Sequence, residues 1–247
     1  MPTYKNRPPL DPDTELRRYI SLNALISMLR ERRLRLTRVD RFADPFEGSV
    51  PKRQIDDQVP LFSSMNSMML DQLAAHHPEM ERPRRRDPWS EMTARRRAMT
   101  RSIHASCWIA GLESEGMWRL YCNDGSPGRG VLLRGTLARI EASVVPHDLY
   151  VSPITYRHYH EGPAFTDDLD AFMHKRLGFQ HEREVRLLKS DQPHYFGLAA
   201  SITGGSEFSP LPPPPLDLPH HIFLAWSPLD HIDAITISPY ADEPYEQ

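Results

Sequence analysis

The apolar residues of this chain fall in many short runs, and their spacing constrains the fold more than any other feature. Most runs alternate apolar and polar residues as half-buried strands do, and short segments with helical spacing or turns separate them. The runs predicted as strands are 16–21, 34–42, 103–110, 131–135, 149–156, 182–189, a stretch within 195–202, 222–226 and 234–239. The segments predicted as helices are 22–33, 59–77, 89–101, 113–122, 137–144 and 164–179. Because strands and helices do not alternate regularly, the predicted class is α+β rather than a doubly wound sheet.

The length of the chain is sufficient for one core of ordinary size. With 247 residues, of which 39% are hydrophobic, we predict a single domain over 1–247. Residues 50–101 are predicted to form a helical insertion, and the proline-rich stretch 209–219 is predicted to be a polyproline II-like loop. Neither GxGxxG nor GxxxxGK[ST] occurs, so neither the Rossmann nor the P-loop phosphate site is expected.

Charge is balanced overall but not along the chain. A formal net charge of −3 predicts no general attraction to nucleic acid or to a membrane surface. Residues 82–101, however, contain eight arginines against Asp87 and Glu91. This arginine-rich segment is either compensated on a solvated surface or a phosphate-facing patch that binds nucleic acid.

The cysteines and the apolar segments indicate a compartment. Cys107 and Cys122 are too few for a disulfide framework and are read as free thiols in a reducing compartment. The first residues carry no apolar signal segment, and no run approaches the roughly 18 apolar residues of a membrane helix. We therefore expect a cytoplasmic protein that has no membrane partner.

The stretch HEREVRLL, residues 181–188, carries the most unusual charge pattern. On a strand, side chains two apart share a face, so Glu182, Glu184 and Arg186 are predicted to point to the same side. Such a stripe is either a cross-strand salt-bridge face or a catalytic edge.

Three motifs together resemble a bacterial family known as domain of unknown function 2971. They are DPFEG at 44–48, SCW with MWRLY within 106–121, and F-x-HEREVR at 179–186. The resemblance covers nearly the whole chain except the stretch 50–101. The name of that family states no activity.

A more distant resemblance, to ADP-ribosyltransferase folds, implies a chemistry. Those proteins hold NAD in a cleft of a split β-sheet and use an arginine on the first strand, a serine on a middle strand and a Glu-x-Glu near the end. This chain offers Arg18 or Arg17, then Ser106, then Glu182-x-Glu184, in that order. It departs from the family pattern because the middle motif is Ser-Cys-Trp and an arginine lies between the two glutamates. The resemblance implies an ADP-ribosyltransferase-like split β-sheet with surrounding helices, and NAD as substrate.

The resemblance also implies a role for each candidate residue. Glu184 would stabilise the positive charge that develops on the ribose when the nicotinamide bond breaks, and Glu182 would orient or deprotonate the acceptor. Arg18 would bind the pyrophosphate or the ribose, and Ser106 would support the glutamate. The remaining candidates form an aromatic wall, Tyr19, Trp108, Trp118 and Tyr121, and two phosphate contacts or counter-charges, Lys175 and Arg186.

Each assignment has a structural alternative. Arg18 could simply pair with Asp44 or Glu47, Ser106 could be structural, and Trp118 and Tyr121 could be core residues. The histidines show no metal-ligand spacing, so no metal site is expected.

Three functions are compatible with these patterns. The first is an ADP-ribosyltransferase-like enzyme, of the toxin or phage-defence type, that modifies a protein or a nucleic acid. The second is a metal-dependent nuclease, which requires Asp44 or Glu47 to meet Glu184. The third is a non-catalytic module that binds nucleic acid through the arginine-rich segment.

Overall fold

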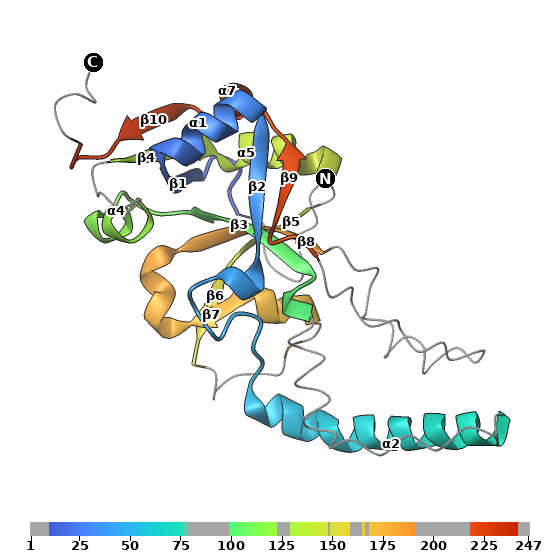
Figure 1. Cartoon of the computed structure of the whole chain (residues 1–247). Helices are drawn as coiled ribbons and strands as arrows, with labels where there is room; N and C mark the ends of the chain where they lie inside the picture. Colours follow the sequence, from blue (N-terminus) through green and yellow to red (C-terminus); the bar gives the residue numbers. More distant parts are fainter. Residues whose placement is uncertain are drawn as a thin grey trace.

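The computed structural model describes residues 10–76, 78, 99–122, 129–147, 149–158, 165, 168–190 and 218–241. Within these residues the fold is α+β, as predicted, with a mostly antiparallel sheet and several helices (Figure 1). The predicted strand within 195–202, most of the proline-rich loop 209–219 and most of the arginine-rich segment lie outside the described residues.

The central sheet has eight strands in the order β10-β4-β1-β3-β2-β9, and β8 joins β3 and β5 joins β8. Among the described residues, the strands that pair in this sheet are all antiparallel. Its strands are β1 (Glu15–Ser21), β2 (Arg33–Arg38), β3 (Ile103–Ile109), β4 (Gly130–Thr136), β5 (Tyr150–Pro153), β8 (Glu184–Ser190), β9 (His221–Ala225) and β10 (Ala234–Ile237). A separate parallel pair is formed by β6 (Thr155–Arg157) and β7 (His174–Arg176).

The sheet is split along one edge of β3. On that edge, β3 meets β1 at Ile109 and meets β2 at His104 and Ala105. Residues 106–108 are in register with neither strand, whereas on the other edge the whole of β3 pairs with β8. Strands β1 and β2, which helix α1 (Leu22–Glu31) connects, therefore diverge and leave the middle of β3 open between them.

Three apolar clusters cover the two faces of the sheet. One packs α1 and α5 (Leu137–Val144) around Trp108, Val185 and Leu187, and α7 (Pro228–His231) lies against α1 and α5. On the opposite face, the 3₁₀ helix η4 (Asp168–Met173) covers Ala105 and Leu188, and α4 (Glu115–Tyr121) covers Tyr19 and Leu132. Figure 1 shows α1, α5 and α7 together at one end of the molecule. The long helix α2 (Lys52–His76) projects from the other end.

The first strand–helix–strand unit follows its local sequence signals closely. Ser21 caps α1, as predicted, by accepting a hydrogen bond from the backbone N–H of Ala24 at 3.2 Å. Helix α1 ends at Glu31, two residues earlier than predicted, because Arg32 takes a left-handed conformation with φ of 48°. Strand β2 is shorter than predicted because it ends at Arg38, where the chain passes into the 3₁₀ helix η1 (Val39–Arg41).

The predicted helix 164–179 is wrong. Its described residues form η4, then strand β7, then a second 3₁₀ helix, η5 (Leu177–Glu182). All of Leu169 to Met173 is buried, so this segment has no polar face to present to water as a surface helix would. Pairing of β7 with β6 then takes the backbone out of helical geometry.

Two other boundaries also differ from the prediction. The strand predicted at 149–156 is two strands, because Pro153 has no N–H and β5 and β6 pair with different partners. Helix α2 begins at Lys52 rather than at residue 59 and runs through Pro60. Among the described residues, none of the helices is both long and apolar enough to cross a membrane.

The turn DPFEG is held by its own side chains and by its glycine. Asp44 accepts a hydrogen bond from the N–H of Phe46 at 3.0 Å, and Gly48 has φ of +67°, in the left-handed region. A β-carbon at Gly48 would collide with the ring of Phe172. The turn is therefore fixed both by backbone conformation and by close packing.

Replacing Gly48 should destabilise the protein. We expect Gly48→Ala to lower the free energy of unfolding by about 2–4 kcal/mol, from left-handed strain together with overpacking. Urea denaturation measures the change. Gly178→Ala is the matched control, because a β-carbon there meets no atom within 4 Å, and it should change the stability by less than about 0.5 kcal/mol. Equal effects of the two substitutions would contradict this account.

Candidate functional site

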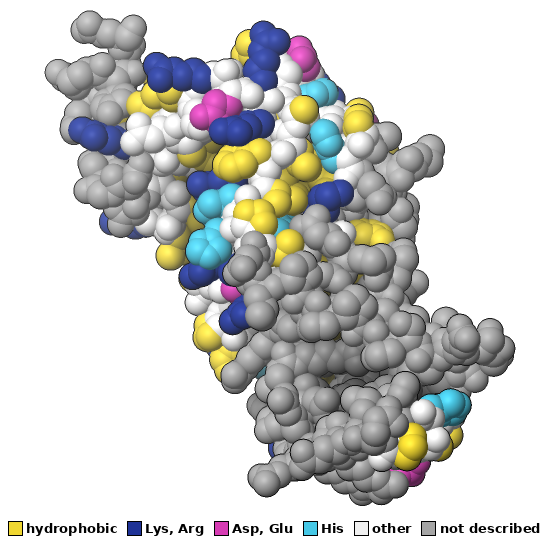
Figure 2. Space-filling model, turned by 45° about the vertical axis from the view of Figure 1, so that its right-hand side comes forward, with side chains coloured by type: hydrophobic (Ala, Val, Ile, Leu, Met, Phe, Trp, Pro, Cys, Tyr) yellow, Lys and Arg dark blue, Asp and Glu magenta, His cyan; other side chains and the backbone are white. Residues whose placement is uncertain are grey.

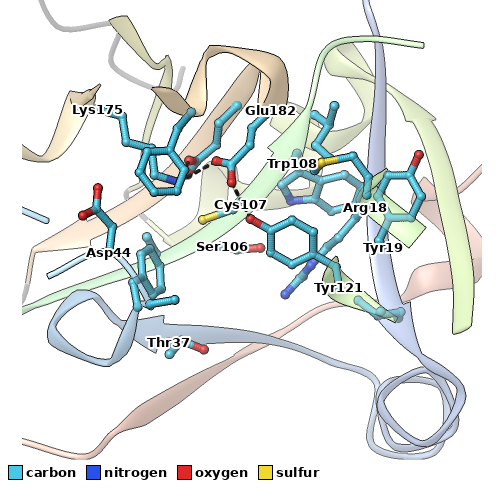
Figure 3. A pocket seen from close by; sticks show the side chains of 18 of the residues that line it. Arg18, Tyr19, Thr37, Asp44, Ser106, Cys107, Trp108, Tyr121, Lys175 and Glu182 are labelled. Atoms are coloured by element: carbon cyan, nitrogen blue, oxygen red, sulfur yellow. Dashed lines mark hydrogen bonds and ion pairs between the residues drawn. The ribbon is translucent and has the colours of Figure 1, made fainter. Parts of the chain in front are cut away.

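A cavity of about 440 Å³ lies at the split in the sheet. Its wall is formed by β1, β2, the open middle of β3, the DPFEG turn, α4, and the segment from β7 to β8. Figure 3 shows side chains from these separate elements pointing toward one another. Strands, a turn and helices from separate parts of the chain thus converge on one space, which is large enough for a small-molecule ligand.

Two carboxylates meet one ammonium group at one end of the cavity. Lys175 Nζ lies 2.6 Å from Glu182 Oε2 and 2.9 Å from Glu184 Oε2, and all three side chains are buried. Glu182 was predicted to lie on the strand, but it is the last residue of η5, and β8 begins only at Glu184. Arg183 between them is left-handed, with φ of 41°, and this bend turns both carboxylates toward Lys175.

A second pair of charges holds Glu184 from behind. Arg186 Nε donates to Glu184 Oε1 at 2.7 Å, and its two terminal nitrogens donate to Glu47 at 3.0 and 3.1 Å. The Arg186 side chain is 0% exposed. Three carboxylates and two cations therefore alternate in one buried network, which fixes Glu184 from both sides.

The network keeps Glu184 ionised. Burial alone would raise the pKa of Glu184, but Arg186 and Lys175 lower it from 4.5 to about 2. Burial likewise opposes the charge on Lys175, yet Glu184 and Glu182 raise its pKa above the ordinary value. The end of the cavity thus carries a fixed carboxylate that needs no deprotonation near neutral pH.

The other end of the cavity carries a cation, Arg18, that has no acidic partner among the described residues. Arg18 lies 5.7 Å from the centre of the Trp108 ring, and its Nη2 makes a long contact of 3.5 Å with the backbone oxygen of Arg35. Its Nη1 is buried and has no hydrogen-bond partner, and burial lowers the pKa of the guanidinium to about 10. No carboxylate of the described residues forms an ion pair with Arg18. An anionic ligand would supply the missing partner.

The open middle of β3 adds further polar groups without partners. The hydroxyl of Ser106 and the indole nitrogen of Trp108 are both buried and make no hydrogen bond. Figure 3 places Ser106 and Cys107 between the Lys175–Glu182 pair and Arg18. Cys107 donates a hydrogen bond to Glu184, and burial followed by the charge of Glu184 raises the pKa of its thiol. Cys107 is therefore a neutral donor rather than a thiolate.

The aromatic candidates take different places. Tyr121 is 47% exposed and donates to Glu182 Oε1 at 2.7 Å, so it lies at the mouth of the cavity. Tyr19 lines the wall, but its hydroxyl accepts a hydrogen bond from the N–H of Ser114. Trp108 also borders the cavity, yet its ring is fully buried. Trp118 is a core residue, 1% exposed, whose indole donates to Glu113 at 2.9 Å.

The cavity brings together eight of the ten predicted site residues. They are Arg18, Tyr19, Ser106, Trp108, Tyr121, Lys175, Glu182 and Glu184. Trp118 lies in the core, and Arg186 lies behind Glu184 as a counter-charge that no ligand can reach. Of the two alternatives for Arg186, its ion pairs with Glu47 and Glu184 fit the counter-charge, and the residue does not line the cavity.

The structure also bears on two structural alternatives from the sequence. Arg18 does not pair with Asp44 or Glu47, because Asp44 binds Arg176 at 2.8 Å and Glu47 binds Arg186. The charges of HEREVRLL do form salt bridges, but on a buried face rather than a solvated one. Their partners, Lys175 and Glu47, come from other elements.

Sequence reasoning missed several residues that line the cavity. Glu47, Cys107 and Phe179 all lie inside the motifs singled out above, so the motifs carried the signal. Arg35 alternates with the buried Leu34 and Leu36 on β2, and this alternation marks it as facing away from the core. The described residues contain no group of three or more His, Cys, Asp or Glu side chains able to hold a metal ion.

Comparisons with known proteins give no relative. No family model matches the chain, and neither a curated protein nor a solved structure matches it. The resemblance to the domain of unknown function 2971 family stays a prediction that rests on its three motifs.

Proposed function

We propose that this protein is an ADP-ribosyltransferase-like enzyme that cleaves NAD and transfers ADP-ribose to a protein or nucleic acid. The observation that carries the proposal is the polarity of the cavity. One end holds an ionised carboxylate, Glu184, and the other holds Arg18, a guanidinium with no acidic partner among the described residues. NAD has the matching polarity, because its ribose becomes cationic during cleavage and its pyrophosphate is anionic.

The split in the sheet supports the same proposal. Ser106, Arg18 and Glu184 come from β3, β1 and β8, and the cavity collects all three where β1 and β2 diverge. This arrangement of strands fits an ADP-ribosyltransferase-like split sheet, which the order of the Arg, Ser and Glu-x-Glu elements implies.

The residues of the cavity can perform the required steps. The bond between nicotinamide and ribose breaks, its electron pair leaves with neutral nicotinamide, and positive charge develops on the ribose. Glu184 stabilises this charge without moving, because Arg186 and Lys175 hold it as a carboxylate. The acceptor then forms a bond to the ribose and gives its proton to a base, for which Glu182 at the cavity mouth is the candidate.

The nuclease alternative has no supporting observation. It requires Glu47 or Asp44 to share a metal ion with Glu184, but Glu47 and Glu184 both bind the guanidinium of Arg186 instead. The described residues offer no metal-ligand set. The binding-module alternative depends on the arginine-rich segment, which lies mostly outside the described residues.

The direct test is incubation of the purified protein with NAD that carries a label on its adenylate half. We expect release of nicotinamide, and transfer of the label to macromolecules when cell lysate is added. Chromatography measures the first product, and autoradiography of resolved protein and nucleic acid measures the second. Absence of turnover together with absence of an NAD-induced thermal shift would refute the proposal.

Arg18→Met should separate ligand binding from stability. Loss of charge-assisted hydrogen bonds to the pyrophosphate is expected to weaken NAD binding by about 10- to 100-fold. The melting temperature without NAD should not fall, because the substitution removes a guanidinium whose buried Nη1 has no hydrogen-bond partner and which pairs with no carboxylate of the described residues. Calorimetric titration measures the affinity, and a thermal scan measures the stability.

Arg17→Met is the matched control on the same strand. Arg17 donates to the backbone oxygen of Gly111 and pairs with Glu15, and it does not line the cavity. It should lower the melting temperature and leave NAD affinity within about twofold. NAD binding by Arg18→Met at wild-type strength would show that the pyrophosphate does not bind there.

A further inference from the structure

One face of the sheet continues from the cavity onto the outer surface. Strands β2 and β9 pair so that Arg35 lies opposite Phe223 and Thr37 lies opposite His221, and paired residues share a face. Arg35 and Thr37 also line the cavity. We call the surface formed by these residues together with Arg41 and His220, which adjoin it, the β2–β9 face.

Among the described residues, no carboxylate neutralises the positive charge on the β2–β9 face. Arg35 and Arg41 are both exposed, and neither forms an ion pair with a carboxylate of the described residues. The Nη2 atom of Arg41 instead lies 2.6 Å from His220 Nε2. Nearby acids are already engaged, because Asp40 pairs with Arg38 and Glu31 pairs with Arg33.

The pKa of His221 is consistent with the same excess of positive charge. Burial lowers its pKa, and Arg35, His220, His104 and Arg41 each lower it further. The largest charge effects on this pKa thus all come from cationic or histidine side chains. The β2–β9 face is thus a region of positive potential that favours an anionic partner.

An aromatic ring lies within this positive region. Phe223 is 45% exposed, and the guanidinium of Arg33 lies 4.1 Å from the centre of its ring. Figure 2 shows Lys and Arg, histidine and hydrophobic side chains next to one another on the face that it presents, rather than a patch of one kind. Cations that bind phosphates beside a ring that stacks on a base are the features that single-stranded nucleic acid requires. An acidic peptide offers charge but no flat bases for the ring.

We propose that the β2–β9 face binds single-stranded nucleic acid, with phosphates on Arg35 and Arg41 and a base on Phe223, and leads the strand to the cavity. The conclusion that this strand accepts ADP-ribose rests on the proposed function. Binding to the β2–β9 face does not, because it involves neither Glu184 nor NAD.

Binding is tested by fluorescence anisotropy with the full chain and a labelled oligothymidylate of roughly 16 nucleotides. We expect Arg35→Gln and Phe223→Ala each to weaken binding about tenfold. Arg35→Gln should also reduce the slope of log affinity against log salt concentration by about 1, because one phosphate contact is lost. Phe223→Ala should leave that slope, and the binding of inorganic polyphosphate, unchanged.

Two controls locate the site. Arg53→Gln removes an arginine that is 91% exposed on α2, and should leave binding unchanged. Arg85→Gln removes one charge from the arginine-rich segment, which could bind the strand on its own. If Arg85→Gln weakens binding as much as Arg35→Gln does, or if Phe223→Ala has no effect, the proposal is overturned.

The same experiment separates this proposal from the proposed function. Glu184→Gln should bind the oligothymidylate as the wild type does, whether or not NAD is cleaved. If the protein does not cleave NAD, the proposal that the β2–β9 face binds nucleic acid still stands. If the protein does not bind oligothymidylate, that proposal fails, and the proposal of NAD cleavage is unaffected.

Discussion

Glu184→Gln should reduce nicotinamide release by about 10²- to 10³-fold, the largest effect expected on activity. The amide has the shape of the carboxylate but no charge with which to stabilise the ribose cation. The site around it should persist, because Arg186 keeps Glu47 as a partner and Lys175 keeps Glu182. Initial rates of nicotinamide release at saturating NAD measure the effect, and circular dichroism verifies the fold.

Glu182→Gln provides the matched comparison at a neighbouring carboxylate. If Glu182 accepts the proton of the acceptor, its amide should reduce label transfer by about 10²-fold and change the hydrolysis of NAD only a few-fold. Nicotinamide release by Glu184→Gln at the wild-type rate would remove Glu184 from the mechanism. Equal losses of hydrolysis in both variants would show that the two carboxylates act as one unit.

The parts of the fold that were predictable are those with local signals. Examples are the spacing of the leucines in α1, the Ser21 cap and the apolar run of β3. Each of these signals lies within the element that it predicts or directly beside it. Residues 168–182 differ because their conformation depends on distant partners. Pairing with β6 and burial beneath the sheet override the helical spacing there, and no local pattern reports either.

The candidate site likewise has residues that the sequence predicted and contacts that it did not. Motifs supplied Glu182, Glu184, Ser106 and Arg18, because these residues stand in recognisable order along the chain. The network that makes Glu184 a fixed anion could not be predicted, since Glu47 and Arg186 are separated by 139 residues. The geometry that joins Glu182 and Glu184 was also missed, because it depends on the left-handed Arg183 rather than on strand alternation.

Arg186→Met should have the largest effect on stability. The substitution leaves Glu47 and Glu184 buried without the guanidinium that binds both of them, and removing one partner of such a network costs about 3–5 kcal/mol. Urea denaturation at neutral pH measures this loss. Arg119→Met is the control, because Arg119 pairs with Glu115 on the surface of α4, and its loss should cost less than about 0.5 kcal/mol.

The pH dependence of unfolding tests the cause of that loss. In the wild type the pKa of Glu184 lies at about 2 instead of 4.5, so its contribution is present above pH 4.5 and is lost as the pH falls toward 2. A pKa shift of this size corresponds to about 3 kcal/mol in the free energy of unfolding.

Without Arg186 the pKa of Glu184 should rise, because burial is then opposed by only one neighbouring cation, Lys175. The stability of Arg186→Met should therefore lose this acid-dependent step, and adding Glu47→Gln should recover part of the neutral-pH loss by removing one of the two buried carboxylates that lost the guanidinium. If the variant kept the wild-type step between pH 4.5 and 2, the low pKa of Glu184 would have another source.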